Sequence, residues 1–259
     1  MTGGWAMTQA TGPVPTLLSL LGLGLLWTVA AAGLDDPDVL PGPMAVWQVI
    51  VTEAARGVLW EHLLATLGRV VAAFTLAMGL GSILGVLLGQ SHLLDRWLFP
   101  WVSVFLNLPA LVVIVLCYLW IGLNEVAAIA AVAINKTAMV AVTLREGVRS
   151  LDHRLSEMAQ VQRMSWPQRM RHVLFPQLWP FVATAMRNGL AVIWKIVLVV
   201  EFLGRSNGVG FQIHLYFQLF DTVTVLAYSL SFVAVMLVIE YAFLQPWEIR
   251  ARAWQARTN

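Results

Sequence analysis

Long apolar stretches separated by short polar ones constrain this chain more than any other feature of its sequence. A transmembrane helix needs about 20 predominantly apolar residues. Stretches of that length lie at about residues 14–34, 62–88, 98–121, 126–144, 179–202 and 222–243. In lipid the backbone must satisfy its hydrogen bonds internally, and helices of this length do so. The pattern therefore predicts an all-α, polytopic membrane protein with about six transmembrane helices, forming one domain over residues 1–259.

Composition supports this class and excludes others. Hydrophobic residues make up 59% of the chain and charged residues only 12%, whereas an average soluble domain is about 25% charged. The formal net charge of +2 does not indicate nucleic-acid binding. The single cysteine, Cys117, excludes an intrachain disulfide and any cysteine-based metal site. It lies in an apolar run, so we expect it to pack as a small hydrophobic side chain.

The first apolar stretch has two interpretations. It is either a retained span or a signal peptide, because Ala30, Ala31 and Ala32 resemble a small-residue cleavage site. The stretch has no positively charged region before it and is long for the apolar part of a signal peptide. We therefore prefer the retained span. The residues after it are external in both interpretations.

Two of the spans carry residues that affect helix packing. Gly79, Gly81, Gly85 and Gly89 recur in the second span, and small residues let helices approach closely in lipid. The third span is interrupted by Pro109. A proline at this depth needs neighbours that satisfy the freed carbonyl. It marks either a simple kink or a break that lines a pathway.

The distribution of Lys and Arg sets the orientation, because cytoplasmic loops are enriched in both. With the N-terminus inside, only Arg56 and Arg205 fall in external loops. The cytoplasmic set is Arg96, Arg145, Arg149, Arg154, Arg163, Arg169, Arg171, Arg250, Arg252 and Arg257. This bias places the polar loop of about residues 145–177 in the cytosol.

That loop predicts two short helices. Asp152 is a suitable N-cap for a helix from about His153 to Arg163. An almost apolar stripe on this helix follows the i, i+3, i+4, i+7 spacing of one helix face. Its members are Leu155, Met158, Ala159 and Gln162.

The second short helix begins with a capping box. Ser165 is followed by Gln168 three residues later, with Pro167 in the first turn. We expect this helix to stop near Phe175, because Pro176 disfavours helical geometry in the residue before it.

These residues resemble the EAA loop of bacterial ABC-importer permeases. The matching positions are Glu157, Met158 and Ala159, then Arg163, then Phe175 with Pro176. Met158 replaces an alanine of the family pattern, and Arg163 replaces a glycine. The resemblance implies a type I ABC-importer permease fold in which the first short helix docks in a groove of an ATPase. The candidate ATPase-coupling residues are Leu155, Glu157, Met158, Ala159, Gln162 and Arg163.

Other segments resemble the nitrate, sulfonate, taurine and bicarbonate branch of these permeases. They are the stretch from Leu40 to Pro43, the stretch from His62 to Arg69, and a pattern in the fifth span. That pattern consists of Arg187, Gly189, Trp194, Glu201, Gly208 and Gly210. The resemblance implies a bacterial inner-membrane complex of two permease copies, two ABC ATPase subunits and an external solute-binding protein. ATP and Mg²⁺ would bind in the partner ATPase, and small anions would be the substrates.

Four basic residues lie within or at the ends of spans: Arg69, Lys136, Arg187 and Lys195. A charge at the centre of a transmembrane helix costs about 2.5–3.5 kcal/mol on insertion scales. Arg69 and Arg187 are closer to span ends, so we expect them to snorkel. Lys136 and Lys195 either hold the bundle through interhelical contacts or line a pathway for an anionic solute. Glu201 lies six residues from Lys195 and need not pair with it. The candidate pathway residues are Asn107, Pro109, Lys136, Trp194, Lys195 and Glu201.

Motifs for catalysis are absent from the sequence. It contains no phosphate-binding Gly-x-x-x-x-Gly-Lys-Ser/Thr and no His-Glu-x-x-His. The five histidines are scattered, which argues against a metal site. We therefore expect a non-catalytic chain without its own cofactor. A secondary transporter or channel, which needs no ATPase, is the alternative function.

Overall fold

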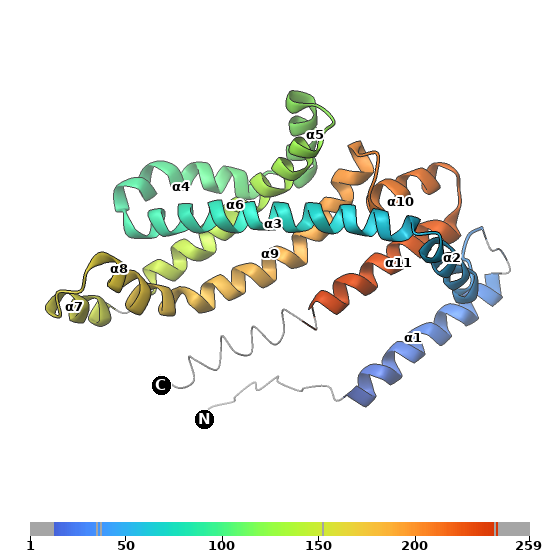
Figure 1. The fold of residues 1–259 in the computed structure, drawn as a ribbon, viewed down its shortest axis with the longest axis horizontal. Coiled ribbons are helices and arrows are strands. Elements are labelled where there is room, and N and C mark those ends of the chain that lie inside the picture. Colours follow the sequence, from blue (N-terminus) through green and yellow to red (C-terminus); the bar gives the residue numbers. More distant parts are fainter. Residues whose placement is uncertain (1–12, 35, 37, 152, 241, 243–259) are drawn as a thin grey trace.

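The computed structural model describes residues 13–34, 36, 38–151, 153–240 and 242, and this part of the chain contains helices and no strand (Figure 1). The α-helices are α1 (Pro13–Leu34), α2 (Pro43–Ala55), α3 (Val58–Gln90), α4 (His92–Asn107), α5 (Ala110–Ile121), α6 (Glu125–Arg149), α7 (His153–Val161), α8 (Trp166–Arg169), α9 (Phe175–Gly204), α10 (Val209–Gln218) and α11 (Thr222–Ile239). One π-helical turn, η1 (Met170–Leu174), joins α8 to α9.

Close packing of α3 on α6 forms the centre of the fold, and α9 packs against both. A Cβ atom added to Gly81 would lie 2.6 Å from Cβ of Val140. One added to Gly89 would lie 2.5 Å from Cβ of Val148. The expected role of the glycines is confirmed at these positions, because no larger residue fits between the two helices. Cys117 is buried in the apolar core beside them, as predicted.

Apart from Leu108 and Pro109, the described residues of the predicted spans are helical. Among the described residues, α3, α6 and α11 are long and apolar enough to cross a membrane. The pair α4 and α5 adds a fourth if it is counted as one span. The first and fifth predicted spans lie on α1 and α9, which are not among those helices. Residues 241 and 243, at the end of the sixth predicted span, lie outside the described residues.

The third span contains a sharp break. The two helices α4 and α5 meet at 99°, which is far larger than a proline kink. Asn135 of α6 donates a hydrogen bond from Nδ2 to the carbonyl oxygen of Leu108 at 3.4 Å. A neighbouring helix thus supplies a donor to the carbonyl of Leu108, the residue before Pro109, and helps to hold the chain at this break. The geometry is that of a break rather than a simple kink.

The predicted stop near Phe175 is wrong in one respect. An element boundary does fall there, but the chain stays helical through η1 into α9. Pro176 occupies the first turn of α9. Pro176 closely follows the π-helical turn, so the change in helix type coincides with its missing N–H. The helix that carries the fifth predicted span, α9, therefore begins before Trp179, at Phe175.

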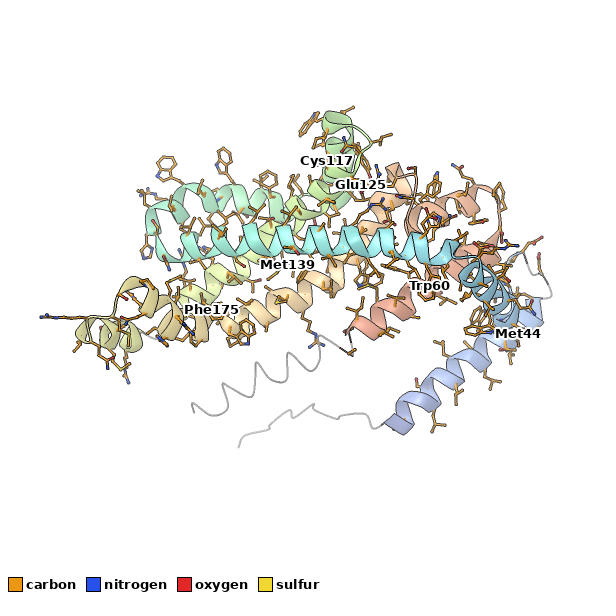
Figure 2. The ribbon with its side chains drawn as sticks, viewed as in Figure 1. Met44, Trp60, Cys117, Glu125, Met139 and Phe175 are labelled. Carbon is orange, nitrogen blue, oxygen red and sulfur yellow. The ribbon has the colours of Figure 1, made fainter. Side chains whose placement is uncertain are left out.

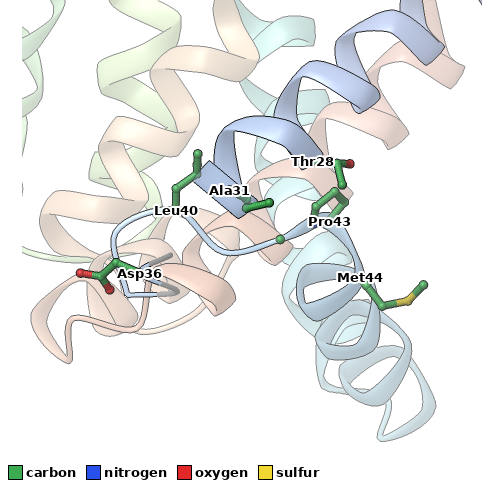
Figure 3. A pocket seen from close by; sticks show the side chains of 8 residues that line it. Thr28, Ala31, Asp36, Leu40, Pro43 and Met44 are labelled. Carbon is green, nitrogen blue, oxygen red and sulfur yellow. The ribbon is translucent and has the colours of Figure 1, made fainter. Parts of the chain in front are cut away.

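The first helix lies at the edge of the fold. Trp27 of α1 donates a hydrogen bond from Nε1 to the carbonyl oxygen of Pro41 at 3.0 Å. A hollow of about 540 Å³ separates the C-terminal part of α1 from the start of α2 (Figure 3). Its lining includes Thr28, Ala31, Asp36, Leu40, Pro43 and Met44. None of the predicted pathway residues lines it. A helix over these residues fits both a retained span and a signal peptide.

Candidate functional site

The loop that the sequence predicts to be cytoplasmic lies at one end of the molecule and contains the predicted helix–turn–helix (Figure 1). The first helix, α7, ends at Val161, two residues earlier than expected. The predicted N-cap, Asp152, lies outside the described residues. In the capping box, Oε1 of Gln168 accepts hydrogen bonds from the backbone N–H and the hydroxyl of Ser165, at 2.9 Å and 3.0 Å. The predicted start of the second helix is therefore confirmed, although α8 itself ends at Arg169.

Arg163 adopts a left-handed backbone conformation, with φ = 50°. The N–H of Met164 donates to the carbonyl oxygen of Ala159 at 3.0 Å, which is the six-to-one bond of a Schellman motif. Glycine is the usual residue at this position because it has no Cβ to strain the left-handed backbone. The conformation explains why glycine is the residue that the EAA pattern has at this position.

Replacing Arg163 by glycine should therefore stabilise the loop. A left-handed conformation costs a non-glycine residue roughly 1–2 kcal/mol. We expect Arg163→Gly to slow hydrogen exchange in α7 by about fivefold or more, which corresponds to about 1 kcal/mol. Arg169→Gly, an exposed control in the same loop with an ordinary helical context, should speed exchange or leave it unchanged. Faster exchange after Arg163→Gly would show that the arginine side chain stabilises the turn.

The face that α7 exposes differs from the predicted one. Ala159 is only 1% exposed within the chain itself, so its side chain does not face a partner. Val161 is 83% exposed and Met158 is 45% exposed. Glu157, Gln162 and Arg163 are also exposed. The prediction that Ala159 faces a partner was wrong, because its side chain packs against the rest of this chain. Residue spacing defines a helix face but does not show which residues of that face are buried within the chain. The side chain of Leu155 lies outside the described residues.

A buried ion-pair cluster lies at the opposite end, and we name it the external cluster because the sequence predicts that end to be external. Arg69 of α3 donates from Nη1 to Oε1 of Glu201 at 2.6 Å. It donates from Nε and Nη2 to the two oxygens of Glu125, at 2.8 Å and 2.6 Å. Figure 2 shows Glu125 between α5 and the C-terminal end of α9. The backbone oxygen of Asn207 accepts a further bond from Arg69 at 2.9 Å. Together these contacts hold α3, α6 and α9 to the segment before α10.

The carboxylate of Glu201 is enclosed by the glycines that follow it. It is 0% exposed, and its Oε2 accepts hydrogen bonds from Thr66 Oγ1 at 2.9 Å and from the N–H of Gly210 at 2.8 Å. A Cβ atom on Gly208 would lie 2.4 Å from the carboxyl carbon. The glutamate and the two glycines of the fifth-span pattern are therefore one structural unit.

His62 closes the cluster on the side of α10. The N–H of Gly208 donates to His62 Nδ1 at 3.0 Å. An imidazole that accepts at Nδ1 is neutral and carries its proton on Nε2. That nitrogen lies against the side-chain amide of Gln212, whose oxygen otherwise has no partner. With the amide oxygen facing Nε2, that oxygen accepts the ring proton.

The charges within this cluster balance. Arg205 of the external segment also donates to Glu125, at 2.6 Å. Arg69 and Arg205 thus face Glu125 and Glu201. The expectation that Arg69 snorkels is wrong: its side chain is 5% exposed and pairs with two carboxylates. Glu201, predicted in the pathway, is instead buried in this neutral cluster, so we assign it to packing.

The other predicted pathway residues lie outside the cluster. Asn107 and Pro109 are exposed at the break between α4 and α5. Lys136 is half-buried on α6, and Lys195 is exposed on α9 with its Nζ 5.4 Å from the centre of the Trp194 ring. Trp194 also packs on Phe232, with ring centres 5.7 Å apart. No carboxylate within the described residues pairs with Lys136 or Lys195, and the structure does not bring the two lysines into direct contact.

The comparisons with known proteins bear directly on this geometry. Residues 77–244 match the family of binding-protein-dependent transport system inner membrane components. This match covers the break, the EAA-like loop and the Glu201 unit. The chain belongs to this family of ABC-transporter permeases. The permease is 30% identical to the taurine transport system permease protein TauC of Escherichia coli, over 98% of this chain and 94% of TauC.

Two further relatives are more distant. The permease is 27% identical to the bicarbonate transport system permease protein CmpB of Synechocystis, over 77% of this chain and 75% of CmpB. A solved structure of an amino acid ABC transporter with histidines aligns with a TM-score of 0.63 at 21% identity, covering 77% of this chain and 97% of that chain. The structural likeness shows that the fold is that of an ABC-transporter permease.

Sequence reasoning missed several members of the permease's external cluster, namely His62, Glu125, Arg205 and Asn207. A signal for the central pair was present, because Arg69 and Glu201 both lie near the external ends of their predicted spans. Charged residues within a bilayer usually pair with one another. No group of three or more His, Cys, Asp and Glu residues able to hold a metal occurs among the described residues.

Proposed function

We propose that this permease forms, with a second copy, the pathway of an ATP-driven importer in the bacterial inner membrane. Two ATPase subunits would bind the α7 helices, and an external solute-binding protein would deliver the solute. ATP and Mg²⁺ would bind in the ATPase, so this chain would carry no catalytic group. Lipid would cover the remaining apolar surface. Membership in a family of binding-protein-dependent permeases supports this set of partners.

The main support for the proposed coupling role is the exposed apolar surface of α7. Val161 and Met158 lie three residues apart on one helix face and both are exposed. A helix of nine residues is too short to be stable alone, since isolated helices below about 12–15 residues are marginal in water. A groove on a partner buries such a face. Glu157 beside it is positioned to contact a charge at the rim of that groove.

The solute class follows from unpaired positive charge. Within the described residues, Lys136 and Lys195 have no carboxylate partner, while the charges of the external cluster are balanced. Two unneutralised ammonium groups at membrane depth favour a small anion. Relatives named for taurine, a sulfonate, and for bicarbonate support this class. Lys136, Lys195, Trp194, Asn107 and Pro109 are the residues that we propose for the pathway.

Substituting Val161 tests the coupling role. Val161→Asp places a carboxylate where we propose a buried apolar contact, which is costly without a partner. We expect recovery of the ATPase with the purified permease to fall by about tenfold or more, a change that corresponds to about 1.4 kcal/mol. Glu157→Lys should give a smaller loss. Ala159→Asp is less informative, because it would also disrupt the packing of α7 on its own chain.

Val39→Asp is the matched control. Val39 is 61% exposed in the external loop, so the same change in chemistry should leave ATPase recovery unaltered. Membrane insertion should be normal in both variants. If Val161→Asp binds the ATPase as well as the unsubstituted permease does and supports normal ATP-driven uptake, α7 is not the coupling helix.

A further inference from the structure

A second ion-pair cluster lies at the cytoplasmic end, where α4 begins beside the end of α6. Both oxygens of Asp95 contact the guanidinium of Arg145, Oδ1 through Nε and Oδ2 through Nη2, the latter at 3.0 Å. Arg149 donates from Nη2 to the same Oδ2 at 2.5 Å. The guanidinium of Arg145 also lies 3.9 Å from the centre of the Phe99 ring. One carboxylate of α4 is thus held by two consecutive turns of α6.

This contact is largely shielded from water. The side chain of Arg145 is 10% exposed and that of Asp95 is 15% exposed. Exposed ion pairs contribute little to stability, whereas removing one partner of a buried pair leaves an uncompensated charge. By contrast, Glu146, which also contacts Arg145, is 58% exposed. Asp95 is therefore the acidic group on which the α4–α6 contact depends.

The two helices are also joined near the break. The hydrogen bond from Asn135 to the carbonyl of Leu108 lies at the C-terminal end of α4. Asp95 lies at the N-terminal end of α4, so α4 is attached to α6 at both ends. Helices attached in this way move as one body, because interfaces have discrete arrangements and do not deform continuously.

The joined pair connects the proposed coupling helix to the break. At one end, α6 finishes at Arg149 and α7 begins at His153, so only a short turn separates them. At the other end, α4 finishes at Asn107, where the chain turns by 99° into α5. One route from α7 to the break runs through α6 and the N-terminal end of α4, and this route requires that end of α4 to follow α6.

We propose that Asp95 is a positioning residue that makes α4 follow α6, so that movement of α7 changes the opening at the α4–α5 break. This inference rests on the proposed function of α7. Asp95 touches neither solute nor ATP in this role. It acts through Arg145 and Arg149, and its loss would separate ATP hydrolysis from transport while the ATPase stays bound.

The experiment measures how accessible the α4–α5 break is to a labelling reagent. A cysteine is placed at Asn107, which is exposed at the end of α4, in a Cys117→Ser background. The purified complex in liposomes is labelled with a membrane-impermeant maleimide, with and without ATP and vanadate. ATPase recovery and ATP hydrolysis are measured in the same samples. In the otherwise unsubstituted complex, we expect ATP with vanadate to change the labelling rate by about tenfold, the factor that 1.4 kcal/mol represents.

Asp95→Asn should reduce this ATP-dependent change severalfold, because the contact of Asn135 still joins α4 to α6, while the ATPase is still recovered and still hydrolyses ATP. Glu146→Gln, the matched removal of an exposed carboxylate one residue from Arg145, should leave the change intact. Asp95→Glu should restore it in part, because the charge is kept. A merely structural role would lower recovery of the folded complex and would not alter labelling in the part that remains.

Arg149→Gln provides a milder variant in case Asp95→Asn does not fold. It removes the half-exposed contact and leaves the pair of Asp95 and Arg145, so we expect a reduced change in labelling in a complex that assembles. Persistence of the full ATP-dependent change in Asp95→Asn, or in Arg149→Gln where Asp95→Asn does not fold, overturns the inference. Loss of ATPase recovery in Val161→Asp is a separate result, because it tests α7 and not Asp95.

Discussion

Replacing Arg69 by methionine should destabilise this permease more than any other single change of an ionisable residue that we consider. Glu201 would keep its hydrogen bonds from Thr66 and Gly210 and would stay 0% exposed, but it would lose the one cation that pairs with it within the described part of the chain. Breaking a buried ion pair by removing one partner costs about 3–5 kcal/mol. We expect the apparent Tm of the purified protein to fall steeply and the yield of folded protein to drop.

The double variant Arg69→Met with Glu201→Gln separates charge from packing. It removes the unpaired carboxylate, and Arg205 remains to neutralise Glu125. We therefore expect the double variant to recover much of the stability that Arg69→Met loses. If it is no more stable than Arg69→Met, loss of the other Arg69 contacts, to Glu125 and Asn207, is the dominant effect.

Lys195→Met is the matched control for the same change of side chain. Lys195 is exposed and has no carboxylate partner among the described residues, so its replacement should leave the apparent Tm unchanged. Uptake of a small anion such as bicarbonate should nevertheless fall, since we propose that Lys195 lines the pathway. Equal stability of Arg69→Met and Lys195→Met would contradict the importance of the external cluster.

Gly208→Ala should be the most damaging of the conservative substitutions. The backbone at Gly208 has φ = 108°, and an added Cβ would lie 2.4–2.5 Å from the atoms of the Glu201 carboxylate. That carboxylate cannot move away without leaving Arg69. Overpacking costs about 1–3 kcal/mol and a left-handed backbone roughly 1–2 kcal/mol. Together these effects should cost about 2–5 kcal/mol and should be measurable as a large fall in apparent Tm.

Gly57→Ala isolates the contribution of the backbone. Gly57 also has a positive φ, of 82°, but an added Cβ meets nothing within 4 Å. We expect only the backbone cost of roughly 1–2 kcal/mol in this variant. If both alanine variants lose the same stability, the close approach of Gly208 to Glu201 has no energetic consequence and the Glu201 unit is less rigid than its contacts indicate.

The features that the sequence determined by itself all depend on patterns among residues close together in the chain. Apolar length placed the helices, glycine spacing marked the face of α3 that packs on α6, and Ser165 with Gln168 marked the start of α8. Each depends on residues within a few turns of one another, whose relative positions are set by the geometry of a helix. The family resemblance at Glu201, Gly208 and Gly210 likewise required no knowledge of how the helices pack.

Tertiary structure decided which side chains meet. Arg69 and Glu201 are 132 residues apart in sequence, and their pairing depends on how α3 and α9 are rotated and at what depth each lies. The same holds for Asp95 and Arg145, which are 50 residues apart. The burial of Ala159 likewise depends on how α7 packs against the rest of the chain. Periodicity defines a face of a helix but not its neighbour. The contacts that neutralise buried charge were therefore fixed only when the helices packed together.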